Sequence, residues 1–383
     1  MKVLQVAPYF YPAWAYGGIP RLSYHLAKSL ARLGVEVEVV TTDALDQNRR
    51  REELNFIIDE VQVRGYRNLS NYLAYYFQFF LPIGLAKEKP GLKSYDLVHI
   101  HGHRNLLNSR LSFWANQAHV PIILQPNGTL VNIERRQNLK AIYDLLIGNR
   151  QIKRIDLFIA VSESEKKQFV RMGIPEAKIR IVPNGVFVEE PKPGLSFKEK
   201  FGIKGDYILY LGKLTPRKGI EYMIQALSLI PDKNLKAVVA GNDMGILNKL
   251  KALVKKLNLN ERVIWTGLLL SPWKESAYQE ALVTVYAGQD EIFGLVQFES
   301  ILCGTPAIVA DDSGAGEWLK KSGGGYIVPY GEARAIAEVI MSLNPEKEKP
   351  KLMKAQKWIK ENLSWEKIAK DMKEIYQDLV GRR

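Results

Sequence analysis

Short apolar runs alternate with amphipathic stretches along most of this chain. The run KVLQVA (2–7) predicts a strand, and a loop rich in Tyr, Pro and Gly (8–20) follows it. Leucines then recur at helical spacing between residues 21 and 33 and end at Gly34, a residue type that commonly terminates helices. The next run, VEVEVVTT (35–42), alternates as a strand does. This order predicts a βαβ unit with parallel strands and a right-handed crossover.

The same alternation continues in two successive halves. Further strands are predicted in the first half at 96–102, 121–125, 156–162 and 179–184, and in the second half at 207–213, 237–242, 263–267, 281–287 and 305–311. A proline-containing loop near 185–195 separates the halves. We therefore expect two α/β domains, 1–187 and 188–362, and a C-terminal segment, 363–383, whose amphipathic helix returns to pack on the first domain.

Composition narrows the class of protein. A chain of 383 residues with 46% hydrophobic and 25% charged residues is typical of a two-domain globular protein. The single Cys303 excludes an intramolecular disulfide framework, and no signal-peptide pattern opens the sequence, so we expect a cytoplasmic protein. The net charge of +13 favours anionic partners. Because no zinc-finger spacing or basic region joined to heptads occurs, we expect no nucleic-acid partner.

The most hydrophobic window, YLAYYFQFFLPIGL (72–85), is too short to span a bilayer. Three alternatives remain open for it: an interfacial helix, a core helix or a wall of an acceptor pocket. Its basic neighbours, together with Arg135 and Arg136, are compatible with peripheral contact with an anionic membrane at its inner face.

Two glutamates follow the apolar run 281–287. The segment EIFGLVQFES places Glu291 in a loop, Gly294 at an expected helix start and Glu299 on that helix. A helix start offers backbone N–H groups and a positive dipole end to an anion. Ligands of parallel sheets gather at the carboxyl ends of strands, so this arrangement predicts a sugar-nucleotide site. The alternative is that both glutamates are ordinary solvated residues.

Two lysines follow another predicted strand. In LGKLTPRKG, Lys213 comes directly after the strand and Lys218 lies just before a helix expected near Gly219. Two ammonium groups at the carboxyl end of a strand could neutralise a diphosphate, most strongly as charge develops on a departing group. The alternative is that Lys218 is an ordinary turn residue.

The histidines of HIHGH (99–103) form a compact cluster. His99 and His101 would share one face of a strand, but no Cys or carboxylate set completes a tetrahedral site nearby in the sequence. We therefore expect structural or acceptor-contacting roles and no metal.

Together these motifs resemble the retaining glycosyltransferases of family 4. GKLTPRKG, WTG and EIFG with Glu299 are similar to the family's donor domain, and the resemblance covers nearly the whole chain. Other segments that resemble the family are Gly17 and Gly18, HIHG (99–102), AVSESEK (160–166), VPNGV (182–186), GTPAIVAD (304–311) and WEKIAKDM (365–372). The resemblance implies a GT-B fold, in which two Rossmann-like parallel-sheet domains face each other across a cleft.

The resemblance also implies roles for residues of the second domain. Lys213, where the family usually has arginine, and Lys218 would contact the donor diphosphate. Glu291 would hold hydroxyls of the donor sugar, and Glu299 the ribose hydroxyls. Further donor contacts would come from Leu268 against the base and from the backbone of Phe293, Gly294 and Leu295.

In the first domain, Gly17 and Gly18 would let the backbone approach the diphosphate closely. Asn127 stands where many members have a histidine near the reacting carbon, and it cannot carry a proton as a histidine does. His101 and Asn127 would contact the acceptor or line the cleft.

The implied activity is metal-independent, retaining transfer of a hexosyl group from a UDP-, GDP- or ADP-sugar to a carbohydrate or lipid-linked acceptor, without a cofactor, in polysaccharide, glycolipid or glycan assembly. Two alternatives stay open: a sugar-nucleotide epimerase or phosphorylase of the same fold, and a non-catalytic subunit that binds nucleotide sugars. A dehydrogenase is disfavoured because no dinucleotide-type glycine triplet follows the first strand.

Overall fold

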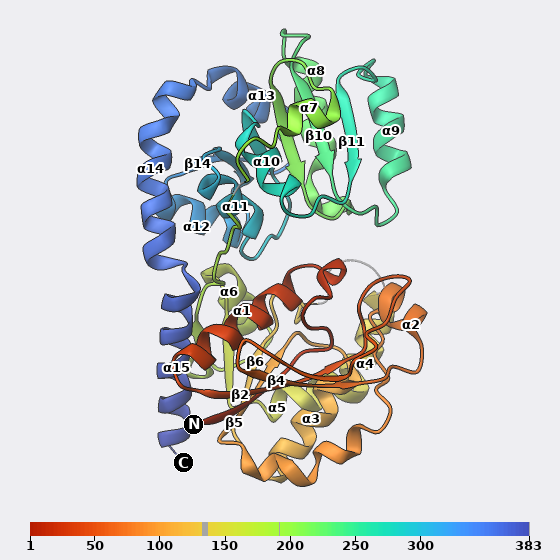
Figure 1. Cartoon of the computed structure of the whole chain (residues 1–383), viewed down its shortest axis with the longest axis vertical. Coiled ribbons are helices and arrows are strands. Elements are labelled where there is room, and N and C mark those ends of the chain that lie inside the picture. Colours follow the sequence, from red (N-terminus) through yellow and green to blue (C-terminus); the bar gives the residue numbers. More distant parts are fainter. Residues whose placement is uncertain (132–136, 191, 383) are drawn as a thin grey trace. The chain divides into compact units, whose positions relative to one another are not determined.

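The computed structural model describes residues 1–131, 137–190 and 192–382, and the chain divides into two units (Figure 1). Unit 1 is Met1–Gly185 with Trp365–Arg383, and unit 2 is Val186–Ser364. The boundaries expected from the sequence are 187/188 and 362/363. Each unit contains its own sheet, as two successive α/β halves require.

Unit 1 contains an eight-stranded sheet of order β3-β4-β2-β1-β5-β6-β7-β8. All its strand pairs are parallel except the β3–β4 hairpin. The strands are β1 (Lys2–Val6), β2 (Glu36–Thr42), β3 (Asn55–Ile58), β4 (Val61–Tyr66), β5 (Leu97–His101), β6 (Ile122–Gln125), β7 (Leu157–Ala160) and β8 (Ile179–Ile181). Strands β2, β3 and β4 lie on one side of β1, and strands β5 to β8 lie on the other side. The strand order therefore reverses between β1 and β5.

Helices cover both faces of this sheet. They are α1 (Gly18–Arg32), α2 (Asn71–Phe77), α3 (Leu106–Gln117), α4 (Gln137–Tyr143), α5 (Asn149–Lys153), α6 (Glu163–Arg171) and α15 (Trp365–Gly381). Leu4, Val98 and Ile100 belong to the aliphatic core that includes α3. The alternate positions of the same strands face the other way, toward α15, which runs beside α1 in Figure 1.

Unit 2 contains a six-stranded, all-parallel sheet of order β11-β10-β9-β12-β13-β14. Its strands are β9 (Tyr207–Leu211), β10 (Lys236–Ala240), β11 (Val263–Gly267), β12 (Val283–Tyr286), β13 (Ala307–Ala310) and β14 (Gly325–Val328). Its helices are α7 (Phe197–Phe201), α8 (Ile220–Leu229), α9 (Leu247–Lys256), α10 (Trp273–Gln279), α11 (Leu295–Leu302), α12 (Gly314–Ser322), α13 (Ala333–Ser342) and α14 (Pro345–Asn362). Here the strand order reverses between β9 and β12.

Every strand expected from an apolar run is present, but β3, β4 and β14 were not expected. β3 and β4 form a partly exposed edge hairpin, and β14 follows two glycines and begins at a third, so none of them has a long continuous apolar run. Helix α1 begins at Gly18 rather than Arg21, because Pro20 is tolerated in a first turn, where its missing N–H has no partner to lose.

The hydrophobic window 72–85 is not a core helix, one of the three alternatives. α2 ends at Phe77, before Gln78, which adopts a left-handed conformation. Tyr72 and Ile83 are each 60% exposed, whereas Phe80 is buried against Tyr9, with ring centroids 5.4 Å apart. Among the described helices, none is long and apolar enough to cross a bilayer.

Candidate functional site

In unit 2, Lys213, Lys218 and Glu291 of the predicted site lie on the two loops where the strand order reverses. β9 and β12 are hydrogen-bonded neighbours, so the loops that leave their carboxyl ends lie side by side. Lys213 and Lys218 are on the loop after β9, and Glu291 is on the loop after β12. A reversal of strand order leaves a crevice at this edge, the usual ligand site of open parallel sheets.

Lys218 and Glu291 form an ion pair at this point. The Lys218 Nζ also donates to the Tyr286 hydroxyl at 2.8 Å, and that hydroxyl donates to Glu291 Oε2 at 3.1 Å. The side chains of Lys218 and Glu291 are only 20% and 17% exposed. Each charge therefore depends on the other, because neither has much water to solvate it.

This pairing overrides the effect of burial on both pKa values. Burial alone would raise the pKa of Glu291, but the Lys218 ammonium and the Tyr286 hydroxyl hold that pKa below its usual value. Burial alone would lower the pKa of Lys218, but the Glu291 carboxylate raises it. Both groups are charged at neutral pH, as anion neutralisation and hydroxyl binding require.

The two loops also touch through their backbones. The N–H of Gln289 donates to the carbonyl of Arg217 at 2.7 Å. Gly219 has φ +67°, and a Cβ there would lie 2.2 Å from the carbonyl oxygen of Ala287. Only glycine permits both this backbone conformation and this approach. The glycine after Lys218 therefore fixes the distance between the two loops.

No side chain caps the start of α11, so its backbone N–H groups are not bound by a capping residue. The N-cap of this helix is Gly294, at φ +75°. Phe293 is 2% exposed and packs against Trp318, so only its backbone can face a ligand. Gln297 supports the turn by donating to the carbonyls of Phe293 at 3.2 Å and Ala315 at 2.9 Å.

Glu299, on the second turn of α11, is held by α10. Its Oε2 lies 3.2 Å from Lys274 Nζ and accepts from the Tyr278 hydroxyl at 3.1 Å. Lys274 is buried and also lies 3.4 Å from Glu275. Leu268, the predicted base contact, follows β11 and is 50% exposed. A carboxylate fixed from behind in this way can present its other oxygen to a pair of hydroxyls.

In unit 1 the predicted glycines lie after β1, on one side of its reversal point. Gly17 adopts φ 103° and ψ −136°, a conformation that other residues avoid. It is the N-cap of α1 and has no side chain to cap the helix, and Gly18, the first helical residue, is exposed. The backbone here can approach a ligand without obstruction.

His101 does not fit the expected acceptor contact. Its ring is 1% exposed, packs against His99 with centroids 4.3 Å apart, and lies 3.3 Å from Gln5 Oε1. Burial lowers its pKa to about 3, so the ring is neutral. His99 Nδ1 lies 2.5 Å from the hydroxyl of Tyr376 on α15. The pair forms a polar layer between sheet and helix, too deep to touch a sugar at the edge of the unit.

Asn127 lies on the loop after β6, with φ +51°, a left-handed conformation that asparagine tolerates well. Its Nδ2 donates to the carbonyl of Gln125 at 3.4 Å. Its buried Oδ1 has no hydrogen-bond partner among the described residues. This oxygen can accept a hydrogen bond from an O–H or N–H group of a ligand.

Two charged residues hold the Asn127 loop by its backbone. Glu165 of α6 is fully buried and accepts from the N–H groups of Gly128 at 2.7 Å and Val161 at 2.8 Å. Burial raises its pKa to about 7, against the effect of these two donors. On the other side of the loop, Arg104 donates to the carbonyl of Leu130 at 2.7 Å.

Metal binding and nucleophilic catalysis by a cysteine have no support comparable to that of the donor site. Among residues 1–131, 137–190 and 192–382, no group of three or more His, Cys, Asp or Glu side chains is arranged to hold a metal ion. Burial raises the pKa of the Cys303 thiol to about 12, which makes it a poor nucleophile.

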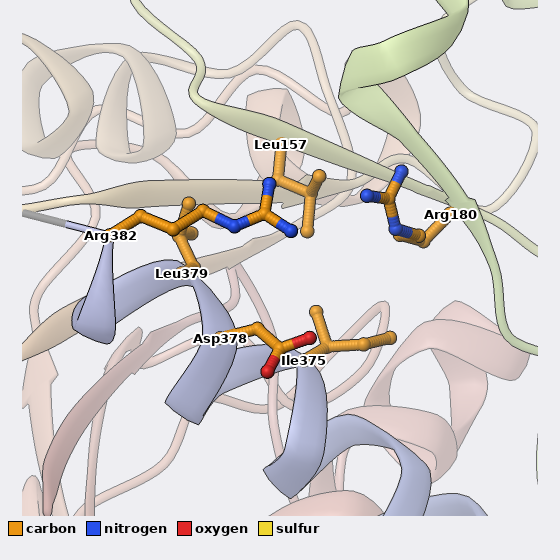
Figure 2. Close-up of a pocket in the computed structure, with 6 residues that line it drawn as sticks. All are labelled: Leu157, Arg180, Ile375, Asp378, Leu379 and Arg382. Atoms are coloured by element: carbon orange, nitrogen blue, oxygen red, sulfur yellow. The ribbon is translucent and has the colours of Figure 1, made fainter.

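Figure 2 shows a pocket of unit 1 that none of the predicted site residues lines. It is lined by Leu157 of β7, Arg180 of β8, Ile375, Asp378 and Leu379 of α15, and Arg382, which follows that helix. Leu157 is the first residue of β7, so the pocket lies toward the amino-terminal edge of the sheet. It is separate from the candidate site.

Comparison with known families agrees with this architecture. Residues 16–190 match Glycosyltransferase Family 4, and residues 192–357 match Glycosyl transferases group 1. The chain belongs to the family 4, group 1 glycosyltransferases. The first matched region contains β2 to β8 and the second contains β9 to β14, and the strand order of each sheet is that of a parallel α/β domain.

Relatives and solved structures match the glycosyltransferase along its length. An uncharacterised glycosyltransferase of Methanocaldococcus jannaschii is 26% identical over 100% of both chains. A D-inositol 3-phosphate glycosyltransferase of Jonesia denitrificans is 24% identical over 94% of this chain and 91% of its own.

Among solved structures, sucrose-phosphate synthase of Thermosynechococcus elongatus superimposes with a TM-score of 0.76 at 20% identity over 100% of both chains. HepE of Anabaena, in complex with UDP and glucose, gives 0.73 at 18% identity over 99% of this chain and 100% of its own. The fold is GT-B.

Several residues of the glycosyltransferase's site were not expected from the sequence. Tyr286 lies in an apolar run and resembles an ordinary core residue, and Tyr278 lies among the polar residues of α10 and resembles a surface residue. Lys274 looked like a surface lysine, since nothing in the sequence shows its burial. Glu165 did leave a signal, because Ser162 and Glu165 have the spacing of a capping box, and Ser162 Oγ accepts from the Glu165 N–H at 3.2 Å.

Proposed function

We propose that this glycosyltransferase moves a hexosyl group from a nucleotide-diphosphate sugar to an acceptor hydroxyl, with retention of configuration, in the assembly of a polysaccharide, glycolipid or other glycan. The observation that carries the proposal is the Lys218–Glu291 pair, which Tyr286 bridges at the reversal point of unit 2, on the loop that leads to the uncapped start of α11. Positive charge, an anion-binding helix end and a carboxylate lie together there.

The donor is assigned to unit 2 by this chemistry. Lys213, Lys218 and the N–H groups at Gly294 and Leu295 bind the diphosphate, because each offers positive charge to it. Glu291 accepts hydrogen bonds from hydroxyls of the sugar. The HepE structure contains UDP and glucose, and a further similar structure contains UDP-2-fluoro glucose, which supports a nucleotide-sugar donor here.

Glu299 binds the two ribose hydroxyls, and Leu268 lies against the base. Lys274 and Tyr278 hold the Glu299 carboxylate in place, so the ribose hydroxyls meet a carboxylate that is already positioned to accept their hydrogen bonds. The two glutamates therefore have different roles, since Glu291 acts on the sugar that is transferred and Glu299 on the nucleotide that remains.

The transfer step needs no enzyme nucleophile. The bond between the anomeric carbon and the diphosphate oxygen breaks while the acceptor oxygen bonds to the same carbon from the same face. The acceptor proton passes to a phosphate oxygen of the leaving diphosphate. Lys213, Lys218 and the start of α11 stabilise the charge that develops on that group, so their contribution is largest in the transition state.

The acceptor is assigned to the carboxyl edge of unit 1. Asn127 offers its Oδ1 to an acceptor hydroxyl, whereas Gly17 and Gly18 keep the role toward the donor diphosphate that the family resemblance implies. Glu165 and Arg104 position the Asn127 loop without touching the substrate. Asparagine binds and orients but takes no proton, which agrees with proton transfer to the donor phosphate.

Calorimetric titration with UDP-, GDP- and ADP-glucose, followed by NMR of the product, tests the proposal. We expect one nucleotide series to bind, an α-linked donor to give an α-linked product, and EDTA to leave the rate unchanged. Failure of every nucleotide sugar to bind, or a product of inverted configuration, would contradict it. Interconversion of two sugar nucleotides without an acceptor would instead indicate an epimerase.

A further inference from the structure

A helical run in unit 1 presents aliphatic side chains to solvent. It consists of α4, a π-helical turn (Asp144–Gly148) and α5. Its aliphatic face is formed by Leu139, Ile142, Leu145 and Leu146, which are 58%, 54%, 73% and 58% exposed. Leu139, Ile142 and Leu146 recur at the spacing of one helix face, so the face is a continuous stripe.

The opposite side of the run is held by polar contacts instead of an apolar core. Asp144 accepts from Arg104 Nε at 2.9 Å and from Nη2 at 2.7 Å. The Tyr143 hydroxyl donates to the carbonyl of Asn105 at 3.0 Å, and Gln151 Nε2 donates to Ser112 Oγ at 3.0 Å. No residue of α4 is buried. A surface helix usually buries its apolar face and exposes its polar face, whereas this run does the opposite. An exposed aliphatic stripe of this kind marks a contact surface.

The charge beside the stripe is positive. Residues 137–154 contain four basic residues and one acid. That acid, Asp144, is neutralised by Arg104. Arg150 and Lys153 are exposed. An aliphatic helix face flanked by cations is the pattern of a segment that lies in the headgroup region of an anionic bilayer.

The run is tied to the loop assigned to the acceptor. Arg104 binds Asp144 and also donates to the carbonyl of Leu130, three residues after Asn127. We propose that the aliphatic face docks on an anionic lipid surface and that the acceptor is an amphiphile presented by that surface, with its sugar at Asn127. This inference rests on the proposed transferase function and names the class of its acceptor.

Vesicle flotation tests the inference. Native protein should float with vesicles of phosphatidylcholine and phosphatidylglycerol and remain below vesicles of phosphatidylcholine alone. The double variant Leu145→Ser/Leu146→Ser should bind at least about tenfold more weakly, since two leucines leave the interface. Arg150→Gln/Lys153→Gln should weaken binding by about tenfold as well, from roughly 1 kcal/mol per basic residue.

The matched control is Leu229→Ser/Met353→Ser, which removes two side chains of unit 2 that are 51% and 70% exposed. It should float as the native protein does. Equal loss in this control, or native protein that never floats, would overturn the inference. So would a dimer in sedimentation that the Leu145/Leu146 variant abolishes, because a second copy would then cover the face.

Failure of this inference and failure of the proposed function give different results. Nucleotide-sugar binding measured without vesicles should be the same in native protein and in both face variants. Donor binding without flotation would refute the lipid surface alone. Flotation without binding of any nucleotide sugar would refute the transferase and leave only a lipid-binding surface.

Discussion

The reversal point of unit 2 and that of unit 1 carry different chemistry. In unit 2, charged side chains meet directly, as Lys218 does with Glu291 and Lys274 with Glu299. In unit 1, Glu165 and Arg104 hold the Asn127 loop by its backbone atoms, and the charge of Arg104 is already paired with Asp144, so neutral groups remain at the edge. This contrast agrees with the proposal that unit 2 supplies charge to a charged donor, whereas unit 1 supplies shape and hydrogen bonds to a neutral acceptor.

The largest effect should come from removing the lysine of unit 2. Lys218→Gln should lower kcat by about a thousandfold, since a positively charged donor to the departing diphosphate is lost. The Glu291 carboxylate would lose its partner, so its pKa should rise. Lys233→Gln, an exposed lysine of the same unit, is the control and should keep its activity in a steady-state assay. Equal losses would mean that only general charge matters.

Glu299→Gln should affect binding more than catalysis. The variant loses the ion pair with Lys274 and an acceptor for the ribose, so KM for the donor should rise by roughly tenfold to a hundredfold while kcat changes little. Initial rates over a range of donor concentrations would check this. A fall in kcat with unchanged KM would show that Glu299 acts on the transferred sugar.

A change in unit 1 should affect binding of the acceptor and leave binding of the donor unchanged. Glu165→Gln replaces one carboxylate oxygen by an amide donor facing a backbone N–H, so the Asn127 loop should loosen at a cost of about 1–3 kcal/mol. KM for the acceptor should rise, and calorimetric affinity for the nucleotide sugar should stay unchanged. Weakened donor binding would remove the contrast between the two units.

The same residue predicts a pH dependence of stability. A carboxyl with a pKa raised from 4.5 to about 7 keeps its proton longer in the folded than in the unfolded chain. The free energy of unfolding contributed by Glu165 should therefore fall as pH rises from about 4.5 to about 7, by ~1.4 kcal/mol per pH unit. Native protein should lose stability relative to Glu165→Gln over this range in chemical unfolding. A constant difference would contradict the raised pKa.

The smallest effect on activity should come from the helix that completes unit 1. Tyr376→Phe removes the hydroxyl beside His99 and should lower the free energy of unfolding by about 1–2 kcal/mol, because a buried ring nitrogen loses its partner. Donor affinity should not change. Tyr72→Phe, at an exposed position, is the matched control and should be neutral.

The fold and the unit 2 site were largely predictable because their signals are local. Apolar runs mark the buried parallel strands, and Lys218, Glu291 and Gly294 lie in short motifs next to strand ends. The edge hairpin β3–β4 lacks such a run, so it was missed. Lys274, Tyr286 and Arg104 gain their roles from burial and from partners distant in sequence. Burial also leaves His101 with the structural one of its two expected roles.

The most direct test of the central claim is Glu291→Gln with one nucleotide sugar, followed both by calorimetry with the nucleoside diphosphate and by transfer rate. Glu261→Gln, an exposed glutamate of unit 2, serves as control. Because Glu291 pairs with Lys218, its neutralisation should leave nucleoside diphosphate affinity unchanged or higher while transfer falls by at least about a hundredfold. Mild, parallel losses in both quantities would contradict the assignment of Glu291 to the transferred sugar.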